Sequence, residues 1–356
     1  MIGDGENKEK ERISIIIPCH NVEGQIDRCL KSVTGQTMGL DDVEIICVDD
    51  CSNDSTVDHL LKWEEKYPEN IMVVRCDQNR RQGAARNIGL SYATGKYVTF
   101  VDADDWLEYD YLERLSAPLR FNDYDLVLAN YVRDHYAGDE PIQLDAKDRG
   151  TGGSARSMLI DTDDKREIFL YLQLVPYSAC YRLIKKSLLD DNNIRFIEER
   201  AYEDTAWGLE TCLLVKKVYF AEEYLYHYYV KDDSTVLKKN EDYHADMLYV
   251  QEEKLNKLKH CGFFERYRNV LEFEHIRSCY LSFLKVLALR YDDPPYDLFV
   301  RLKEHIKENI PDIGDNPYIK EGLDPFQKAL LDIVYVPLDE DGFRQIISAI
   351  RDHGGL

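Results

Sequence analysis

Acidic side chains gather directly after two apolar, β-branched stretches of the sequence. Asp49 and Asp50 follow Val43–Val48, and the run Asp-Ala-Asp-Asp at 102–105 follows Tyr97–Val101. Ligands of α/β proteins bind outside the carboxyl ends of parallel strands, so we expect these five acids at one edge of a sheet. Their repulsion is costly unless some are protonated or a cation joins them. The pattern predicts a divalent metal site, with helix capping as the alternative for Asp49.

The spacing favours Asp102 and Asp104 as the metal ligands. Residues two apart in an extended turn can reach the same side, and their carboxylate oxygens suit Mg²⁺ or Mn²⁺. Such an ion keeps open positions for diphosphate oxygens and neutralises charge that grows on a departing diphosphate. The residues therefore favour transfer chemistry with a diphosphate leaving group.

Three arginines, Arg80, Arg81 and Arg86, stand in the segment 79–87 at the start of a predicted helix. A helix start also favours anions, so a positive patch there suits recognition of a phosphate or a base. For Arg80 and Arg81, solvated side chains on a helix are an equally good interpretation. Arg86 lies beside the apolar Ala85 and Ile88, which favours a role at the site.

Two adjacent carboxylates, Glu203 and Asp204, precede a helix predicted near 207–215. Transfer to a hydroxyl group is helped by a base on that hydroxyl, in line with the leaving group, and a positioned carboxylate can serve. The alternative is that this pair caps the helix. His227 lies in an alternating stretch at 224–230, where a structural histidine is favoured over a metal ligand.

The elements that position these residues alternate between strand and helix. β-Branched runs at 13–17, 43–48, 71–75 and 97–101 predict strands, and apolar residues at helical spacing predict helices between them. This order predicts right-handed crossovers and a mainly parallel sheet covered by helices on both faces. Further on we expect an irregular insertion at 137–165, two short strands at 217–221 and 224–230, and a helical region from Asp242 onward.

The bulk composition limits the partners. Among 356 residues, 67 acidic side chains against 45 basic ones give a net charge of -22, which disfavours nucleic acids and anionic lipid surfaces. No apolar run approaches the roughly 20 residues of a membrane span, and the segment Gly3–Arg12 is polar. We expect a cytoplasmic protein that can contact the inner face of the membrane peripherally. Nine cysteines without a C-x-x-C pair argue against structural zinc or disulfides.

Taken in order, the motifs resemble those of glycosyltransferase family 2. They are Ser14–Asn21, Glu44–Ser52, Gly83–Asn87, Ala93–Tyr97 and Phe100–Asp105. Any one of them is a weak signal, but their order and spacing agree over about 95 residues. Tyr202–Thr205 resembles the Glu-Asp motif of the family and Tyr226–Ser234 its closing strand, so the resemblance covers roughly 12–235.

This resemblance implies an α/β fold of the GT-A type, Rossmann-like, with a mainly parallel sheet flanked by helices. It also implies inverting transfer from a nucleotide sugar, with UDP favoured, to a hydroxyl of a saccharide or glycolipid acceptor, with Mn²⁺ or Mg²⁺ as cofactor. The expected domains are a charged tail at 1–11, a GT-A domain at 12–235 and a helical C-terminal region at 236–356. Within the GT-A domain, 12–130 would bind the donor and 131–235 the acceptor.

The family's residue roles carry over by position. Asp50 would contact the nucleotide base, Asp102 and Asp104 would hold the metal, and Asp204, beside Glu203, would deprotonate the acceptor. The donor-binding set implied in this way is Pro18, His20, Asn21, Asp49, Asp50, Gly83, Arg86, Asp102, Ala103 and Lys231. His20 stands where the family usually has Tyr, and Tyr229 replaces a common Arg, which leaves Lys231 as the diphosphate contact.

Three other functions fit the sequence less well. The segment Pro18–Gly24 lacks the G-x-G-x-x-G that a nicotinamide dehydrogenase needs after its first strand. A nucleotidyltransferase would want a glycine-rich, basic loop there. A catalytically inactive sugar-nucleotide binding module is disfavoured by the presence of Asp102, Asp104 and Asp204. The last two functions remain the alternatives, and the sequence names neither the sugar nor the acceptor.

Overall fold

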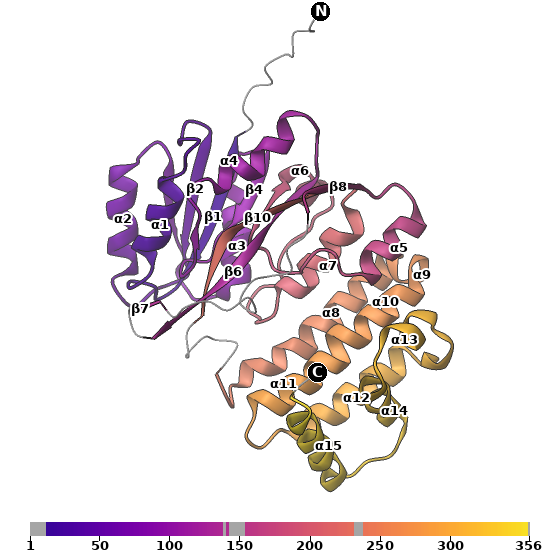
Figure 1. Cartoon of the computed structure of the whole chain (residues 1–356). Coiled ribbons are helices and arrows are strands. Elements are labelled where there is room, and N and C mark those ends of the chain that lie inside the picture. The colour runs from indigo at the N-terminus through magenta and orange to yellow at the C-terminus, as the bar shows by residue number, and fades with distance from the viewer. Residues whose placement is uncertain (1–11, 138–139, 142–153, 231–237, 355–356) are drawn as a thin grey trace, which may run out of the picture. The chain divides into compact units, whose positions relative to one another are not determined.

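The computed structural model describes residues 12–137, 140–141, 154–230 and 238–354, which form two compact units (Figure 1). The first unit comprises the described parts of Met1–Asp161, Ser178–Glu199 and Leu214–Lys231. The second comprises the described parts of Thr162–Tyr177, Arg200–Leu213 and Asp232–Leu356. The units are thus interleaved along the chain, whereas the sequence-based division places one boundary near residue 235.

A mixed sheet of ten strands is the centre of the first unit in the part of the chain described. Its path is β3 (Ile71–Arg75), β2 (Val43–Asp49), β1 (Ile13–Cys19), β4 (Tyr97–Phe100), β9 (Arg182–Lys185), β6 (Leu126–Ala137), β10 (Lys217–Val230) and β5 (Trp106–Leu107), with β7 (Glu140–Pro141) on β6 and β8 (Arg156–Leu159) on β10. The strands β1 to β4 pair in parallel, as predicted, and β9, β5 and β8 pair antiparallel to their neighbours. The α/β fold class is confirmed.

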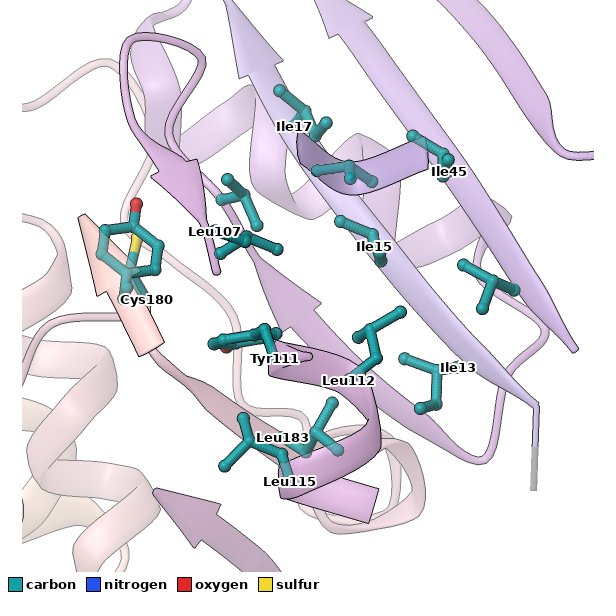
Figure 2. Packing of buried hydrophobic residues seen from close by; sticks show 14 of the residues in the cluster. Ile13, Ile15, Ile17, Ile45, Leu107, Tyr111, Leu112, Leu115, Cys180 and Leu183 are labelled. Atoms are coloured by element: carbon teal, nitrogen blue, oxygen red, sulfur yellow. The ribbon is translucent and has the colours of Figure 1, made fainter. Parts of the chain in front are cut away.

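Alternate residues of β1 face opposite layers of helices. Ile13, Ile15 and Ile17 belong to a buried cluster with Leu112 and Leu115 (Figure 2). These leucines lie on α4 (Tyr111–Ser116), and α1 (Ile26–Thr34) adds its own apolar face to the same cluster. The period of two in a strand explains why one β-branched run serves both faces.

The opposite face of β1 is covered by α3 (Arg81–Tyr92). A Cβ atom on Gly89 would lie 2.4 Å from Ile16 Cγ2, so glycine is what lets the helix approach the strand so closely. The helix buries its small residues, and Tyr92 is 49% exposed. Apolar periodicity alone would place Ala85, Ile88 and Tyr92 on the inner face, but Tyr92 does not lie there, because the close approach at Gly89 favours small side chains.

Two other sequence-based expectations need correction. The stretch 217–230 forms one strand, β10, with register shifts between Phe220 and Tyr224 and between Tyr224 and Tyr226. The irregularity was interpreted from the sequence as a break between two strands. The predicted irregular insertion at 137–165 lies partly outside the described residues, and its described parts are largely regular, with β7, β8 and the start of α5 at Asp163.

The remaining helices of the first unit are short connections on the sheet. They are α2 (Thr56–Lys66), the 3-10 turn η1 (Ala117–Arg120) and α6 (Lys186–Asp191).

The second unit is helical, as the periodicity from Asp242 onward predicted. Its elements are α5 (Asp163–Tyr171), α7 (Asp204–Leu214), η4 (Asp242–Ala245), α8 (Asp246–His260), α9 (Phe263–Arg266), α10 (Arg268–His275), the π-helical η5 (Ile276–Leu281), α11 (Ser282–Arg290), α12 (Tyr296–Asn309), η6 (Ile313–Asp315), α13 (Pro317–Gly322), α14 (Pro325–Asp332), η7 (Ile333–Tyr335) and α15 (Glu340–Asp352). They bury a core of their own around Leu284, Leu302 and Ile347. In the described part of the chain, no helix has the length and apolar character needed to cross a bilayer.

Candidate active site

The acidic runs lie on either side of the end of β1. Cys19 is in register with Asp49 of β2. On the other side of β1, Val101 N donates to Ile16 O at 3.0 Å, an ordinary length for a hydrogen bond between strands. Asp102 follows Val101 directly. The first unit therefore brings Asp49 and Asp102 to the same edge of the sheet, where an α/β protein binds its ligand.

The loops after β1 and β2 are tied together. His20 Nδ1 lies 2.8 Å from the backbone oxygen of Asp50, and Asn53 N donates to Asn21 Oδ1 at 2.8 Å. Asn21 also has a positive φ of 53° and receives support from Ser52 Oγ, which accepts from its backbone N at 3.0 Å. His20 and Asn21 are exposed, so both can meet a ligand. Pro18 is partly exposed at the end of β1.

The side chains of Asp49 and Asp50 are almost fully buried, and both accept hydrogen bonds from backbone N–H groups. Asp50 is 3% exposed, and its Oδ1 accepts from Arg80 N at 2.9 Å. Burial raises the pKa of Asp50, and backbone donation from Arg80 and Arg81 opposes that rise. Asp49 Oδ2 accepts from Ser52 N at 3.3 Å. Asp50 thus ties the start of α3 to the end of β2. It accepts a hydrogen bond from the backbone at a helix start, as a capping residue does, but from far away in the sequence.

The arginines at the start of α3 are paired with carboxylates. Arg86 is 3% exposed, and its Nη2 lies 2.8 Å from Asp102 Oδ1. Arg80 forms ion pairs with Glu198 and, at 3.1 Å, with Glu199. The predicted positive patch is therefore largely balanced by acids. Glu198 and Glu199 were missed because they come from a loop more than a hundred residues further along the chain.

The four residues at 102–105 differ in their exposure to solvent. Asp102 and Asp104 are partly exposed, while Ala103 and Asp105 are buried at 3% and 1%. Asp105 Oδ2 accepts from the Tyr226 hydroxyl at 2.5 Å. Burial raises the pKa of Asp105 well above its usual range, and the charges of Asp104 and Asp102 raise it further. Asp105 is therefore a structural anchor, and Asp102 and Asp104 are the acids that can face a ligand.

Arg28 of α1 is a part of the site that the sequence did not reveal. Its Nη2 donates to the backbone oxygen of Asp104 at 2.7 Å, and its guanidinium lies 4.0 Å from the centre of the Trp106 ring and 4.5 Å from that of Tyr229. It holds the metal-ligand candidate by its backbone oxygen. No motif includes Arg28, so only the fold identifies it.

His227 has both ring nitrogens engaged. Nδ1 lies 2.6 Å from Asp134 Oδ2, Nε2 lies 3.0 Å from Glu108 Oε1, and the ring stacks on Trp106 with centroids 4.9 Å apart. Burial lowers the pKa of His227, but the hydrogen bonds and charges of Asp134 and Glu108 outweigh it and leave the pKa raised. These contacts favour the structural interpretation of this histidine over metal binding.

The proposed base belongs to the second unit. Glu203 is fully buried, whereas Asp204 is partly exposed as the first residue of α7. Thr205 Oγ1 donates to Tyr202 O at 2.8 Å and accepts from Gln251 Nε2 at 3.2 Å, which fixes the start of the helix. Of the two adjacent carboxylates, Asp204 is the one with access to solvent.

Two further residues of the donor-binding set complete the placement. Gly83 is buried in the first turn of α3. Lys231 lies outside the described residues. The first unit thus assembles the donor-binding candidates on three strand ends and one helix start, and the second unit carries the two candidate bases.

Comparison with known proteins assigns this arrangement to a family. The model of "Glycosyl transferase family 2" matches residues 14–192. A poly(ribitol-phosphate) β-glucosyltransferase of Bacillus spizizenii is 33% identical over 223 residues, which are 62% of this chain and 33% of that protein. The poly(ribitol-phosphate) β-N-acetylglucosaminyltransferase TarS of Staphylococcus aureus is 26% identical over 69% of this chain and 41% of its own length. The chain therefore spans well under two thirds of both relatives.

Solved structures share the fold. The crystal structure of residues 1–349 of S. aureus TarS in complex with UDP superposes with a TM-score of 0.69 at 19% identity, covering 96% of this chain and 92% of that one. The same fragment in complex with UDP-GlcNAc gives a TM-score of 0.68 at 20% identity. The GT-A fold and the helical C-terminal region are confirmed.

Proposed function

The chain belongs to glycosyltransferase family 2, and on that premise we propose that it transfers a sugar with inversion from a UDP-sugar to a hydroxyl of a saccharide or glycolipid acceptor. The sugar would be a hexose or an N-acetylhexosamine, and the product part of a cell-surface polymer. The relatives named above, which act with glucose and N-acetylglucosamine on poly(ribitol phosphate), support this proposal. So does the shared fold with a protein determined in complex with UDP and UDP-GlcNAc.

One observation carries the donor side of the proposal: Asp102 and Asp104 are the partly exposed acids at the end of β4. Their charges help to raise the pKa of the neighbouring Asp105, so these carboxylates crowd one another, and a cation there would relieve the repulsion. Asp102 and Asp104 would hold Mn²⁺ or Mg²⁺. When bound, the ion would offset the charge of the departing diphosphate.

The nucleotide base fits best at the ends of β1 and β2. His20 and Asn21 are exposed there and are fixed by backbone and side-chain contacts to the loop at 50–53. A ring held in place can stack on a base without a further loss of side-chain freedom. Asp50, which is buried beside them, would read the base with its carboxyl group or through the loop that it fixes.

We assign the acceptor base to Asp204. Glu203 is fully buried, whereas Asp204 is partly exposed on a helix start held by Thr205 and Gln251. A carboxylate fixed by its backbone can take the proton from the acceptor hydroxyl as that oxygen attacks the anomeric carbon. The hydroxyl proton then resides on Asp204 Oδ, and UDP leaves from the opposite side of the sugar.

The test is a donor and acceptor screen of the purified chain with Mn²⁺. UDP-glucose and UDP-N-acetylglucosamine are incubated with poly(ribitol phosphate), and both UDP release and sugar incorporation are measured. Incorporation that disappears in Asp104→Ala and Asp204→Asn supports the proposal. UDP binding without release or incorporation, with all donors and saccharide acceptors, would show a binding module instead. Pyrophosphate release from UTP and a sugar 1-phosphate would show a nucleotidyltransferase.

A further inference from the structure

Three side chains with nitrogen and sulfur ligands meet inside the second unit, and no motif of the donor or acceptor site includes them. His275 ends α10, Cys279 lies four residues later in the π-helical η5, and His305 lies on α12. One potential ligand atom from each lies within 4.8 Å of the other two. His275 and Cys279 are buried to 1% and 0% exposure, while His305 is at the edge of the cluster and partly exposed.

The hydrogen bonds of the two histidines leave one nitrogen unexplained. His275 Nε2 and His305 Nε2 are 2.9 Å apart, so one of them must carry the proton and the other must accept it. His305 Nδ1 lies 3.3 Å from Asn309 Nδ2, which donates, so the proton of His305 is on Nε2. His275 then carries its own proton on Nδ1. That atom is buried and has no hydrogen-bond partner among the described residues.

A buried polar atom without a partner needs an explanation, and an unseen ion or water is a common one. Here the atom belongs to a group of two imidazoles and a thiol, which are ligands that zinc and similar ions prefer. The opposite tautomers do not remove the problem, because His275 Nδ1 would then be a buried acceptor without a donor. The geometry and the hydrogen bonding therefore point to the same three residues.

We propose that His275, Cys279 and His305 form a binding site for a transition-metal ion of the zinc type in the helical unit. The site is distinct in chemistry from the carboxylates Asp102 and Asp104, which suit hard ions such as Mg²⁺ and Mn²⁺. It would join the end of α10 and the adjoining η5 to α12, which begins at Tyr296. Its role would be to hold the helices together, and the sugar-transfer chemistry does not depend on it.

The distances fit an ion after a small adjustment. Two imidazole nitrogens on a tetrahedral zinc are about 3.3 Å apart, given Zn–N distances of about 2.0–2.1 Å. The three potential ligand atoms, which now lie within 4.8 Å of one another, would move toward the ion to reach these distances. Binding replaces the sulfur–hydrogen bond of Cys279 by a sulfur–metal bond and releases the proton to solvent. Three protein ligands leave a fourth position, which a water molecule can fill.

The positive charge of Lys254, which lies beside the cluster, is balanced by Glu274. Lys254 Nζ lies 3.0 Å from both carboxylate oxygens of Glu274, and the side chains of this pair are 0% and 2% exposed. Ser278 Oγ accepts a third hydrogen bond from Lys254 at 2.8 Å. This pair is neutral as a whole. Lys259 and Arg301, whose charges also act on the two histidines, are held by Asn309 and by Glu252.

The experiment uses the full chain freed of metals by a chelator and then titrated with Co²⁺, a spectroscopic substitute for zinc. We expect one equivalent to bind with a thiolate-to-cobalt charge-transfer band and with the intense visible bands of four-coordination. Zn²⁺ should displace the cobalt and raise the melting temperature by ~5 °C or more at saturation. Cys279→Ser should abolish the charge-transfer band, and His305→Gln should weaken Co²⁺ binding at least tenfold.

Two control variants separate this site from others. Cys261→Ser changes an exposed cysteine of the same unit, and Asp104→Ala changes the proposed donor metal site; both should keep the cobalt spectrum and the thermal shift. If Cys279→Ser fails to fold, His305→Gln decides, because His305 is partly exposed and tolerates a polar substitute. The proposal is overturned by a chain that gives no thiolate band, or by a folded His305→Gln that binds cobalt as tightly as the unchanged chain.

Discussion

Replacement of Arg86 by methionine tests how the arginine at the start of α3 acts. Its side chain is 4% exposed, and Nη2 lies 2.8 Å from Asp102 Oδ1. Methionine keeps an unbranched apolar stem and removes the charge. Two unit charges about 4 Å apart interact by about 4 kcal/mol at an effective dielectric constant of 20. Because Asp102 is 31% exposed, solvent screening reduces this to about 1–2 kcal/mol.

Without its partner, Asp102 should attract a divalent ion more strongly. We expect Arg86→Met to bind Mn²⁺ about 5–30-fold more tightly, which is the same free energy expressed as a binding ratio. Its free energy of unfolding should fall by about 1–3 kcal/mol, less than for a fully buried pair. UDP affinity at saturating Mn²⁺ should change by less than about threefold, since Arg86 acts through Asp102.

Calorimetric titrations with Mn²⁺ and with UDP, together with denaturant unfolding, measure all three quantities. Arg120→Met is the matched control, because it removes the same charge from an exposed position after α4. It should alter neither affinity. The reasoning is refuted if Arg86→Met leaves Mn²⁺ affinity unchanged while UDP affinity falls tenfold or more. Arg86 would then contact the diphosphate directly.

Three further predictions concern single side chains. UDP binding should require Mn²⁺ or Mg²⁺, and Asp104→Ala should remove that requirement together with most of the affinity; equal UDP affinity with metal and with chelator in the unchanged chain would contradict the metal bridge. Asp204→Asn should keep UDP affinity within a few-fold while transfer falls by about 10²–10⁴, and Glu203→Gln should be milder; an inactive Glu203→Gln beside an active Asp204→Asn would move the base by one residue. The raised pKa of His227 means that its imidazolium stabilises the fold below the unfolded-state pKa of about 6.5 and that this stabilisation is lost as pH rises through the folded-state pKa. The difference in unfolding free energy between the unchanged chain and His227→Gln should therefore shrink as pH rises from about 6, and a difference independent of pH would disprove it.

The parallel half of the sheet was predictable because its signals are local. Each of β1 to β4 is a short β-branched run, and residues after a parallel strand end must lie on the ligand-binding edge. For that reason Asp49 and Asp102 could be placed near each other without knowing any long-range contact. The start of α3 could be placed in the same way.

The division of labour within 102–105 could not be predicted. Asp105 is buried by Tyr226, which lies 121 residues further along the chain, and Asp104 is held by Arg28, 76 residues before it. The balance of charge at Arg80 likewise depends on Glu198. A sequence pattern shows that acids and arginines are present, but only tertiary pairing decides which of them remain available to a ligand.

Apolar periodicity does not predict the buried face of α3, and here the reason is different. Apolar periodicity assigns the inner face to the largest apolar residues, such as Ile88 and Tyr92. In this helix the distance to β1 is the stronger constraint, because Gly89 meets Ile16 directly. When a helix packs this closely on a sheet, its inner face carries small residues, so a search for large apolar side chains does not find that face.

Because the two units are interleaved along the chain, the helical unit includes the segment that carries the candidate base. From the sequence it was an appendage that follows a complete catalytic domain. The segment Arg200–Leu213, which carries Glu203 and Asp204, belongs to the helical unit. Its first turn is held by Gln251 of α8, whose amide oxygen in turn accepts from Ser278 of η5 at 3.0 Å. The candidate base is therefore positioned by side chains far beyond the family's motifs, so under the proposed assignment of Asp204 the C-terminal helices would act on catalysis by holding the base in place.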